Sequence, residues 1–193
     1  FIGEIESSVQ RIYAAGDAQQ ARGFEGAAAR RIYKGLNGII NHEAFHLKKR
    51  ERRNPDRINS LLNFGYYLLF SRINATVRAA GLNPYLGFLH SDQDNYESLV
   101  CDIEELFRAK IDRLIVRVIN LKMITEGDFT GAENGWYLKR DAVKTFVNEF
   151  EAEMERKNAK NSMSFKEEVY VQTMIVKKWA MENGDLSFYR WEA

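Results

Sequence analysis

Apolar residues recur every three or four positions along most of the chain, which is the pattern of amphipathic helices that bury one face. Before the middle of the chain it predicts one helix from Ile5 to about Ala21 and another from Glu25 to about Leu47. A break follows at Asn54-Pro55-Asp56, where Asp56 is the expected N-cap of a third helix. That helix should end near Gly81, shortly before Pro84.

The second half of the chain continues the helical pattern with one interruption. A long apolar helix is expected from about Tyr96 to Lys122, in the centre of a bundle. Asn134-Gly135 is typical of the tight turn of a small hairpin, and helices are expected again from about Arg140 to Arg156 and from about Phe165 to Glu182. The pattern therefore predicts an all-α protein, a multi-helix bundle with at most a small β-hairpin near residues 126–138.

Composition limits the number of domains and the cellular setting. A chain of 193 residues with 45% hydrophobic residues can bury one full core, which favours one domain over two. The single cysteine, Cys101, cannot form an internal disulfide, and it is expected in the core and not as a catalyst. No apolar run is long enough to span a bilayer, and the N-terminus lacks the pattern of a signal peptide. We therefore expect a cytoplasmic protein that does not associate with membranes.

Three separated segments offer candidate metal ligands. They are Glu25 in Phe24-Glu25-Gly26, His90 at the end of Gly87-Phe88-Leu89-His90, and the pair Asp102 and Glu105. One imidazole with two or three carboxylates suits Mg²⁺ or Mn²⁺ better than structural zinc, and such ions typically act on phosphodiesters. Asp102 and Glu105 are three residues apart, so on a helix they share a face and can converge on one ion or on its water.

Each of these residues also has a structural explanation. Glu25 at the start of a helix favours the helix dipole, His90 can be a hydrogen-bonded core histidine, and Asp102 with Glu105 can form a solvated face. Their occurrence together favours the metal site. Likewise, Asn59, Asn63 and Tyr66 lie at helical spacing and could hydrogen-bond the site or DNA, but satisfied polar packing is the expectation for them.

Arginines near the carboxylates are candidates for phosphate binding. Arg30 lies five residues after Glu25, and Arg108 lies three after Glu105. Guanidinium groups at these helical spacings can clamp a phosphate, whereas the alternative is a salt bridge that neutralises the acidic residues. The two roles are compatible.

A dense basic run, KKRERRNPDR, extends from Lys48 to Arg57 and can follow a DNA backbone without reading its sequence. The alternative is a solvated loop. A net charge of +1 is low for a protein that binds nucleic acid by itself, so binding must rest on local patches or on partners. The candidate DNA-binding residues are Arg30, Lys48, Lys49, Arg50, Arg52, Arg53, Arg57 and Arg108.

One motif suggests a different activity. His42-Glu43-Ala44-Phe45-His46 matches the H-E-x-x-H pattern of zinc metalloproteases, and Glu97 is a possible third ligand. Against this interpretation, the chain has only three histidines and a basic run begins directly after His46. We interpret the match as a coincidence.

Four stretches occur in a fixed order: FEGAAARRIY (24–33), RNPDRINSLLNFGYYLL (53–69), GLNPYLGFLH (81–90) and SLVCDIEELFRAKID (98–112). In their residues and in their order they closely resemble the C-terminal domain of the CRISPR-associated adaptation integrases, the Cas-one family. The resemblance extends from about Phe24 to about Leu121. It implies a prokaryotic enzyme that lets a DNA 3′-hydroxyl attack a phosphodiester at the edge of a CRISPR repeat and so inserts spacer DNA. With water as the nucleophile, the same site would act as a DNA endonuclease.

The resemblance also implies roles for individual residues. The metal ligands would be Glu25, His90 and Glu105, which would bind Mg²⁺ or Mn²⁺, and Asp102 would be an adjacent carboxylate that orients water or a second ion. Similar proteins have basic residues at the positions of Arg30 and Arg108, so these six residues form the expected catalytic set.

The same resemblance sets expectations for domains and partners. The family's N-terminal β-rich domain, which pairs subunits, has no counterpart in the pattern, so residues 1–193 are expected to form a single helical catalytic domain. The implied partners are spacer-precursor DNA, the CRISPR repeat, a second copy in the full-length protein, and a small dimeric adaptation protein. The remaining alternative is a helical module that binds DNA or protein without catalysis and does not need Glu25 or Glu105.

Overall fold

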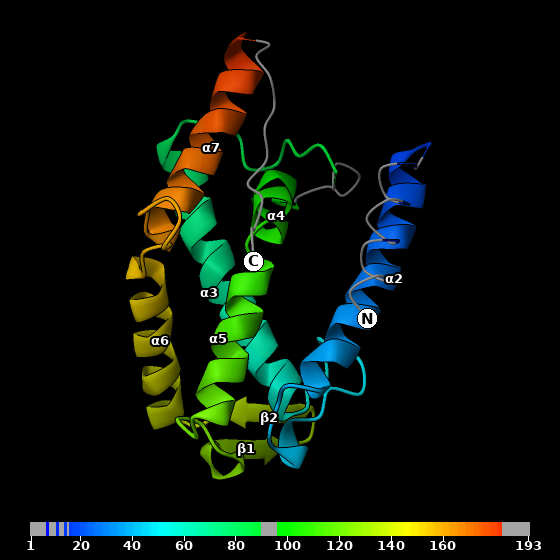
Figure 1. Cartoon of the computed structure of the whole chain (residues 1–193), viewed down its shortest axis with the longest axis vertical. Helices are drawn as coiled ribbons and strands as arrows, with labels where there is room; N and C mark the ends of the chain where they lie inside the picture. The colour runs from blue at the N-terminus through cyan, green and yellow to red at the C-terminus, as the bar shows by residue number, and fades with distance from the viewer. Residues whose placement is uncertain (1–6, 8–10, 12–13, 15, 90–95, 183–193) are drawn as a thin grey trace. The chain divides into compact units, whose positions relative to one another are not determined.

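The described part of the chain is helical apart from one hairpin, as the computed structural model in Figure 1 shows. Residues 7, 11, 14, 16–89 and 96–182 are described. The helices there are α2 (Ala18–Asn37), α3 (Arg57–Ala79), α4 (Ser98–Glu105), α5 (Arg108–Asn120), α6 (Arg140–Glu155) and α7 (Phe165–Glu182). Strands β1 (Phe129–Ala132) and β2 (Gly135–Leu138) form the hairpin, and η1 (Glu43–Phe45) and η2 (Glu126–Asp128) are short 3₁₀ turns. The expected all-α class with a small hairpin is confirmed, and no helix in the described ranges is long and apolar enough to cross a membrane.

Helix α2 differs from the prediction at both ends. Asp17 is its N-cap, since the Asp17 carboxylate accepts a hydrogen bond from the Gln20 N–H, and the helix continues without the expected break between Ala21 and Glu25. It ends at Asn37, ten residues before the predicted end at Leu47. The reason is that the Asn37 side chain donates to the Leu47 carbonyl (2.9 Å) and accepts from the Leu47 N–H (2.7 Å), which turns the chain back after Gly38.

Helix α3 begins and ends where local signals predict. The Asp56 carboxylate accepts a hydrogen bond of 2.8 Å from the Asn59 N–H, as an N-cap does. At the other end Gly81 has a φ of 75°, and the Leu82 N–H reaches back to the Val77 carbonyl at 3.1 Å. This left-handed glycine ends the helix in the usual way.

The single helix predicted from Tyr96 to Lys122 is wrong, because α4 and α5 are separate. At the junction the Leu106 and Phe107 N–H groups bond to the Ile103 and Glu104 carbonyls, three residues earlier instead of four. The tighter turn buries Phe107 completely, against Phe165 of α7 at a ring distance of 5.6 Å. Burial of this ring explains the break, which the smooth apolar pattern did not reveal.

The chain forms two units, which are described separately: Phe1–Leu61 with Val116–Ala142, and Leu62–Ile115 with Val143–Ala193. In the first unit, Arg57 stacks on Trp136 of β2 at 3.8 Å, and the Trp136 N–H bonds to the Pro55 carbonyl at 2.8 Å. Gly135, in the predicted turn, has a φ of 128° and lies so close to Pro55 that a Cβ would be 2.7 Å from the proline ring. This hairpin therefore needs glycine for both its backbone conformation and its packing.

In the second unit, α5 packs closely beside α3 (Figure 1) because Gly65 leaves room for it. A Cβ on Gly65 would be 2.6 Å from Ile111 of α5 and 3.3 Å from Phe146 of α6. Cys101 of α4 is buried, as expected, and burial raises the pKa of its thiol, which makes it a poor nucleophile. Whether both units together form a single catalytic domain remains a prediction.

Candidate functional site

Helix α4 holds the turn that leads toward His90. Asp102 is only 4% exposed, and its Oδ2 accepts hydrogen bonds from the Phe88 N–H (2.6 Å) and the Leu89 N–H (3.1 Å). One helical turn earlier, the Ser98 hydroxyl accepts from the Gly87 N–H (2.9 Å) and donates to the Tyr85 carbonyl (2.7 Å). Two side chains four residues apart on α4 thus fix the backbone of residues 85–89.

Close packing explains why a glycine stands in this turn. A Cβ on Gly87 would be 2.7 Å from both Asp102 Oδ2 and Ser98 Cβ, and 2.8 Å from the Ser98 carbonyl carbon. Ahead of the turn, the Leu99 N–H donates to the Pro84 carbonyl at 3.0 Å. The turn and α4 are therefore fitted to each other through backbone as well as side chains.

Glu105 is the last residue of α4 and lies in a network that reaches α3. Its carboxylate forms an ion pair with Arg108, the first residue of α5, and both side chains are partly exposed (29% and 19%). The Arg108 guanidinium lies 4.4 Å over the ring of Tyr66, and the Tyr66 hydroxyl donates to buried Asp112. The salt-bridge role considered for Arg108 is thus present in the structure. Glu105 keeps access to solvent, whereas Asp102 does not.

The other predicted metal ligands are not described at the level of side chains. Glu25 lies in α2, but its side chain is not described, and His90 lies outside the described residues. Arg30 is exposed on α2. Within the described ranges, no three His, Cys, Asp or Glu side chains are grouped so that they could hold a metal ion. The proposed ligand set Glu25, His90 and Glu105 therefore remains a prediction.

Asn59, a fully buried residue of α3, fixes the path of the basic run. Its Oδ1 accepts from the Glu51 N–H and from Arg50, both at 2.9 Å, and its Nδ2 donates to the Lys49 carbonyl at 2.9 Å. The expectation of satisfied polar packing for Asn59 is confirmed. Its function as the anchor of this loop could not be deduced from helical spacing alone.

The basic side chains of this run differ in exposure. Lys48, Lys49, Arg52 and Arg53 are exposed, whereas Arg50 is partly buried and Arg57 stacks on Trp136. Lys49 also pairs with Glu51 at 3.3 Å. Four cations on an anchored loop form a surface that suits a phosphate backbone, while Arg50 and Arg57 also support the packing.

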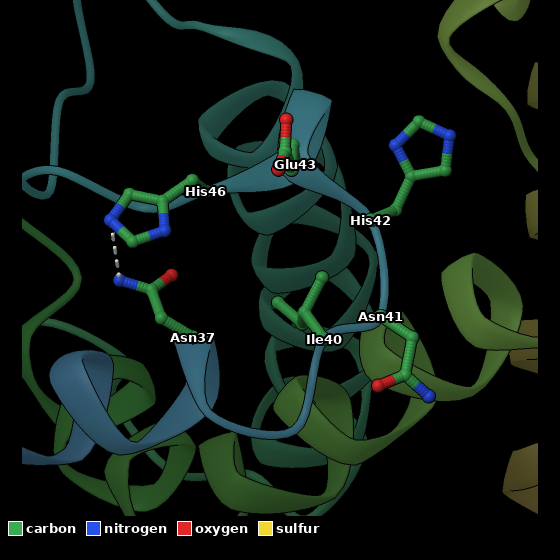
Figure 2. Close-up of a pocket in the computed structure, with 6 residues that line it drawn as sticks. All are labelled: Asn37, Ile40, Asn41, His42, Glu43 and His46. Carbon is green, nitrogen blue, oxygen red and sulfur yellow. Dashed lines mark hydrogen bonds between the residues drawn. The ribbon is translucent and has the colours of Figure 1, made fainter.

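The H-E-x-x-H segment does not have the geometry that a zinc site requires. His42 is the N-cap of the three-residue turn η1, and His46 follows in an extended conformation. The two residues therefore do not lie on successive turns of one α-helix. Figure 2 shows the two imidazoles on opposite sides of the segment. His42 accepts from the Ala44 N–H at 3.3 Å, and His46 Nε2 lies 3.4 Å from Asn37 Nδ2.

This segment borders a pocket of about 260 Å³, lined by Asn37, Ile40, Asn41, His42, Glu43 and His46. The residues around it are mainly polar, and three of them, Asn41, Glu43 and His46, are exposed. Because the histidines diverge, the pocket does not reproduce the arrangement of two imidazoles and a catalytic glutamate. The metalloprotease alternative has no support in this geometry.

Comparisons with known proteins identify the family. Residues 1–152 match the family model described as CRISPR associated protein Cas1. The CRISPR-associated endonuclease Cas1 of Leptospira interrogans is 33% identical over 196 residues, covering 97% of this chain and 76% of the relative. The chain therefore belongs to the Cas1 family of CRISPR-associated proteins, whose relative in this comparison is named an endonuclease. The resemblance deduced from the four ordered stretches is confirmed.

Solved structures agree with this assignment. A Cas1 protein from Thermotoga maritima is 26% identical with a TM-score of 0.87, covering 98% of this chain and 60% of that chain. A chain of a Cas6-RT-Cas1–Cas2 complex is 25% identical with a TM-score of 0.85, covering 94% of this chain and 20% of that chain. The chain thus spans only part of the solved proteins it matches.

Proposed function

We propose that this chain is the catalytic part of a metal-dependent DNA integrase and endonuclease that inserts spacer DNA into a CRISPR repeat. The observation that supports this most strongly is the arrangement on α4. A partly exposed carboxylate, Glu105, is paired with Arg108, one helical turn after a buried carboxylate that holds the turn leading toward His90. Family membership supports the class of reaction, because a relative is named an endonuclease, and the arrangement on α4 offers residues suited to it.

Glu25, His90 and Glu105 are the proposed ligands of one Mg²⁺ or Mn²⁺ ion. The chemistry of this donor set fits, because two carboxylates and one imidazole form a hard, anionic ligand set. When bound, such an ion offsets the negative charge that develops on the phosphodiester during transfer. Glu105 is suited to this role because its side chain is 29% exposed at the end of α4.

Arg108 is the proposed phosphate ligand from the chain itself. Its guanidinium is held between the Glu105 carboxylate and the Tyr66 ring. A side chain that is already ordered loses less conformational entropy when it binds a phosphate, so this pairing prepares Arg108 for the substrate. Arg30, exposed on α2, is proposed as the second arginine of the site.

The basic run is proposed to bind the DNA backbone outside the reacting phosphate. Its exposed cations are Lys48, Lys49, Arg52 and Arg53, and Arg50 and Arg57 flank them. A solved relative is part of a complex named Cas6-RT-Cas1–Cas2. We extend this to the present protein as a proposal: it would act as a homodimer with a small dimeric adaptation partner.

The test is strand transfer of a short DNA duplex into a supercoiled plasmid that contains the repeat, with Mg²⁺ or Mn²⁺. We expect Glu105→Ala to lower the rate by about 100-fold or more, because a direct ligand should matter at least as much as its supporting residues. Glu104→Ala is the matched control, since Glu104 points about a third of a turn away on the same helix. Its rate should stay close to that of the unmodified protein.

Two further measurements separate the alternatives. His46→Ala should leave strand transfer unchanged, because His46 lies in the segment that forms no metal site. Duplex binding, measured by fluorescence anisotropy, should survive Glu105→Ala. The proposal fails if the protein shows no metal-dependent transfer or cleavage, which would favour the binding module, or if activity depends on His46 and not on Glu105.

A further inference from the structure

We infer that Asp102 is a positioning residue: its carboxylate fixes the Gly87–Leu89 turn, which directly precedes His90 in the sequence, and does not meet the metal ion. The inference rests on the proposed function, in which His90 is a ligand. It assigns the two acids of α4 to different tasks. Glu105 would contact the ion, and Asp102 would hold the turn that precedes the histidine in the sequence.

Burial is the first observation that separates the two acids. Asp102 is 4% exposed, whereas the Glu105 side chain is 29% exposed. A ligand of Mg²⁺ in a site for DNA must be reachable by the ion, its waters and the substrate. The accessible acid suits that task, and the enclosed acid does not.

Hydrogen bonding is the second observation. Asp102 Oδ2 already accepts the Phe88 N–H at 2.6 Å and the Leu89 N–H at 3.1 Å. To coordinate an ion with this oxygen, Asp102 would have to weaken both bonds. Two neighbouring backbone N–H groups would then lose a charged acceptor, which is among the stronger hydrogen bonds that a protein forms.

The fit of Gly87 is the third observation. The position where its Cβ would lie is 2.7 Å from Asp102 Oδ2 and 2.7 Å from Ser98 Cβ, and Ser98 bonds to the Gly87 N–H at 2.9 Å. Residues on α4 thus contact the turn at three consecutive positions, Gly87, Phe88 and Leu89. Such supporting contacts usually orient a metal ligand and do not replace it.

Because Gly87 has no ionisable group, it offers a second way to disturb the same contact. Gly87→Ala puts a methyl group where the turn meets α4 and leaves every charge in place. Gly127→Ala is the matched control, since its nearest atom would be Thr125 Oγ1 at an ordinary 3.7 Å. The thermal midpoint of every variant shows whether it is folded under the assay conditions.

The first experiment measures the turn itself, by amide hydrogen exchange at Phe88 and Leu89. Protection should fall at least about tenfold in Asp102→Ala and in Gly87→Ala, because the hydrogen bonds are lost or displaced. Asp102→Asn should keep most of the protection, since its amide oxygen still accepts. Gly127→Ala should keep all of it. Unchanged protection in Asp102→Ala would overturn the inference, whether or not the protein has the proposed activity.

The second experiment measures Mn²⁺ affinity by calorimetry and strand transfer by the plasmid assay. A positioning role predicts a loss of about 10- to 100-fold in Asp102→Ala, a similar loss in Gly87→Ala, and a double variant no worse than either single one. Asp102→Asn should recover most of the loss, because the turn needs an acceptor and not a charge.

The opposite pattern would show a direct contact with the ion. If Asp102→Asn is as damaging as Asp102→Ala while Gly87→Ala behaves like Gly127→Ala, Asp102 acts through its charge and the inference is wrong. Glu105→Gln distinguishes failure of the proposed function. If this variant binds Mn²⁺ and transfers strands like the unmodified protein, the metal site is wrongly assigned, and the exchange data alone decide the role of Asp102 in the turn.

Discussion

The α4–α5 region and the segment from Asn37 to Leu47 show that a sequence motif and a structure can favour different residues as candidate metal ligands. In sequence, His42 and His46 form the sharper motif, because their spacing matches a known zinc pattern. In the structure they diverge, since a three-residue 3₁₀ turn separates them. Asp102 and Glu105, unremarkable as a sequence pattern, lie on a true helix and are tied into their surroundings. The spacing of two residues indicates a shared site only if the segment forms the secondary structure for which that spacing was defined.

The two regions also differ in what holds them together. In the α4–α5 region the acids have charged or hydrogen-bonding partners inside the second unit, including Lys110 with Glu168 and Tyr66 with Asp112. In the Asn37–Leu47 segment the structural contacts come from the Asn37 amide, which bonds to Leu47, and from the buried ring of Phe45, which packs against Phe129, whereas His46 is exposed. Substitutions should therefore be costly in the first region and mild at the histidines of the second.

The largest effect is expected at the buried ion pair between α5 and α7. Lys110→Met should lower the free energy of unfolding by about 3–5 kcal/mol, because Glu168, only 1% exposed, would lose its cation. Urea unfolding measures this. The matched control is Lys166→Met, which breaks an exposed pair with Glu155 and should cost at most about 1 kcal/mol. Equal effects at the two lysines would show that burial does not distinguish the pairs.

A smaller loss is expected at the Tyr66 hydroxyl. Tyr66→Phe keeps the ring under Arg108 but removes the hydrogen bond to Asp112, which is 9% exposed, and should cost about 1–3 kcal/mol. Tyr67→Phe, on an exposed neighbour in α3, should stay within about 0.5 kcal/mol. Differential scanning calorimetry would compare them. If Tyr66→Phe leaves the free energy of unfolding unchanged, the hydrogen bond to Asp112 does not stabilise this region.

In the Asn37–Leu47 segment the amide should matter more than the histidine. Asn37→Ala removes both bonds to Leu47 and should cost about 1–2 kcal/mol, whereas His46→Ala should stay within about 0.5 kcal/mol. Urea unfolding of the two variants side by side gives the comparison. A larger loss for His46→Ala, or a stabilisation of the protein by Zn²⁺ that requires His42 and His46, would restore the sequence motif as a site.

The subtlest expected difference is in acid. Burial by itself raises the pKa of Glu168, but hydrogen bonds from Lys110, Asn158 and Asn161 outweigh burial and lower it below the ordinary value of 4.5. The stability that Glu168 contributes is therefore complete above about pH 4.5 and is lost as the pH falls through its lowered folded-state pKa. The unfolding free energy of Glu168→Gln should fall less steeply between about pH 5 and 3 than that of the unmodified protein. His46→Gln should leave this acid slope unchanged.

The parts of the fold that were predictable have local causes. Asp56 starts α3 and Gly81 ends it through bonds to residues close in sequence, and Asn134-Gly135 marks the hairpin in the same way. The early end of α2 and the break between α4 and α5 depend on contacts with distant residues. Leu47 bonds to Asn37, and Phe107 packs on Phe165. The hydrophobic periodicity of the sequence does not predict such contacts.

The candidate site shows the same division. Sequence identified Asp102, Glu105 and Arg108 as a group, and the structure confirms that Glu105 and Arg108 are paired. The sequence could not show that Asp102 accepts hydrogen bonds from the turn before His90, because those hydrogen bonds join residues 13 and 14 positions apart. The link from Tyr66 to Asp112 crosses between two helices and was equally hidden.

Asn59 has a consequence for how this protein can evolve. It holds the loop before α3 chiefly through the Lys49 carbonyl and the Glu51 N–H, which every amino acid at those two positions can supply, apart from proline at residue 51. Substitutions that change the charges on the loop can therefore leave its backbone path unchanged. A lineage can exchange lysine for arginine, or gain and lose cations at residues 48, 49, 52 and 53, and keep the same backbone while the charge of the surface proposed to bind DNA changes.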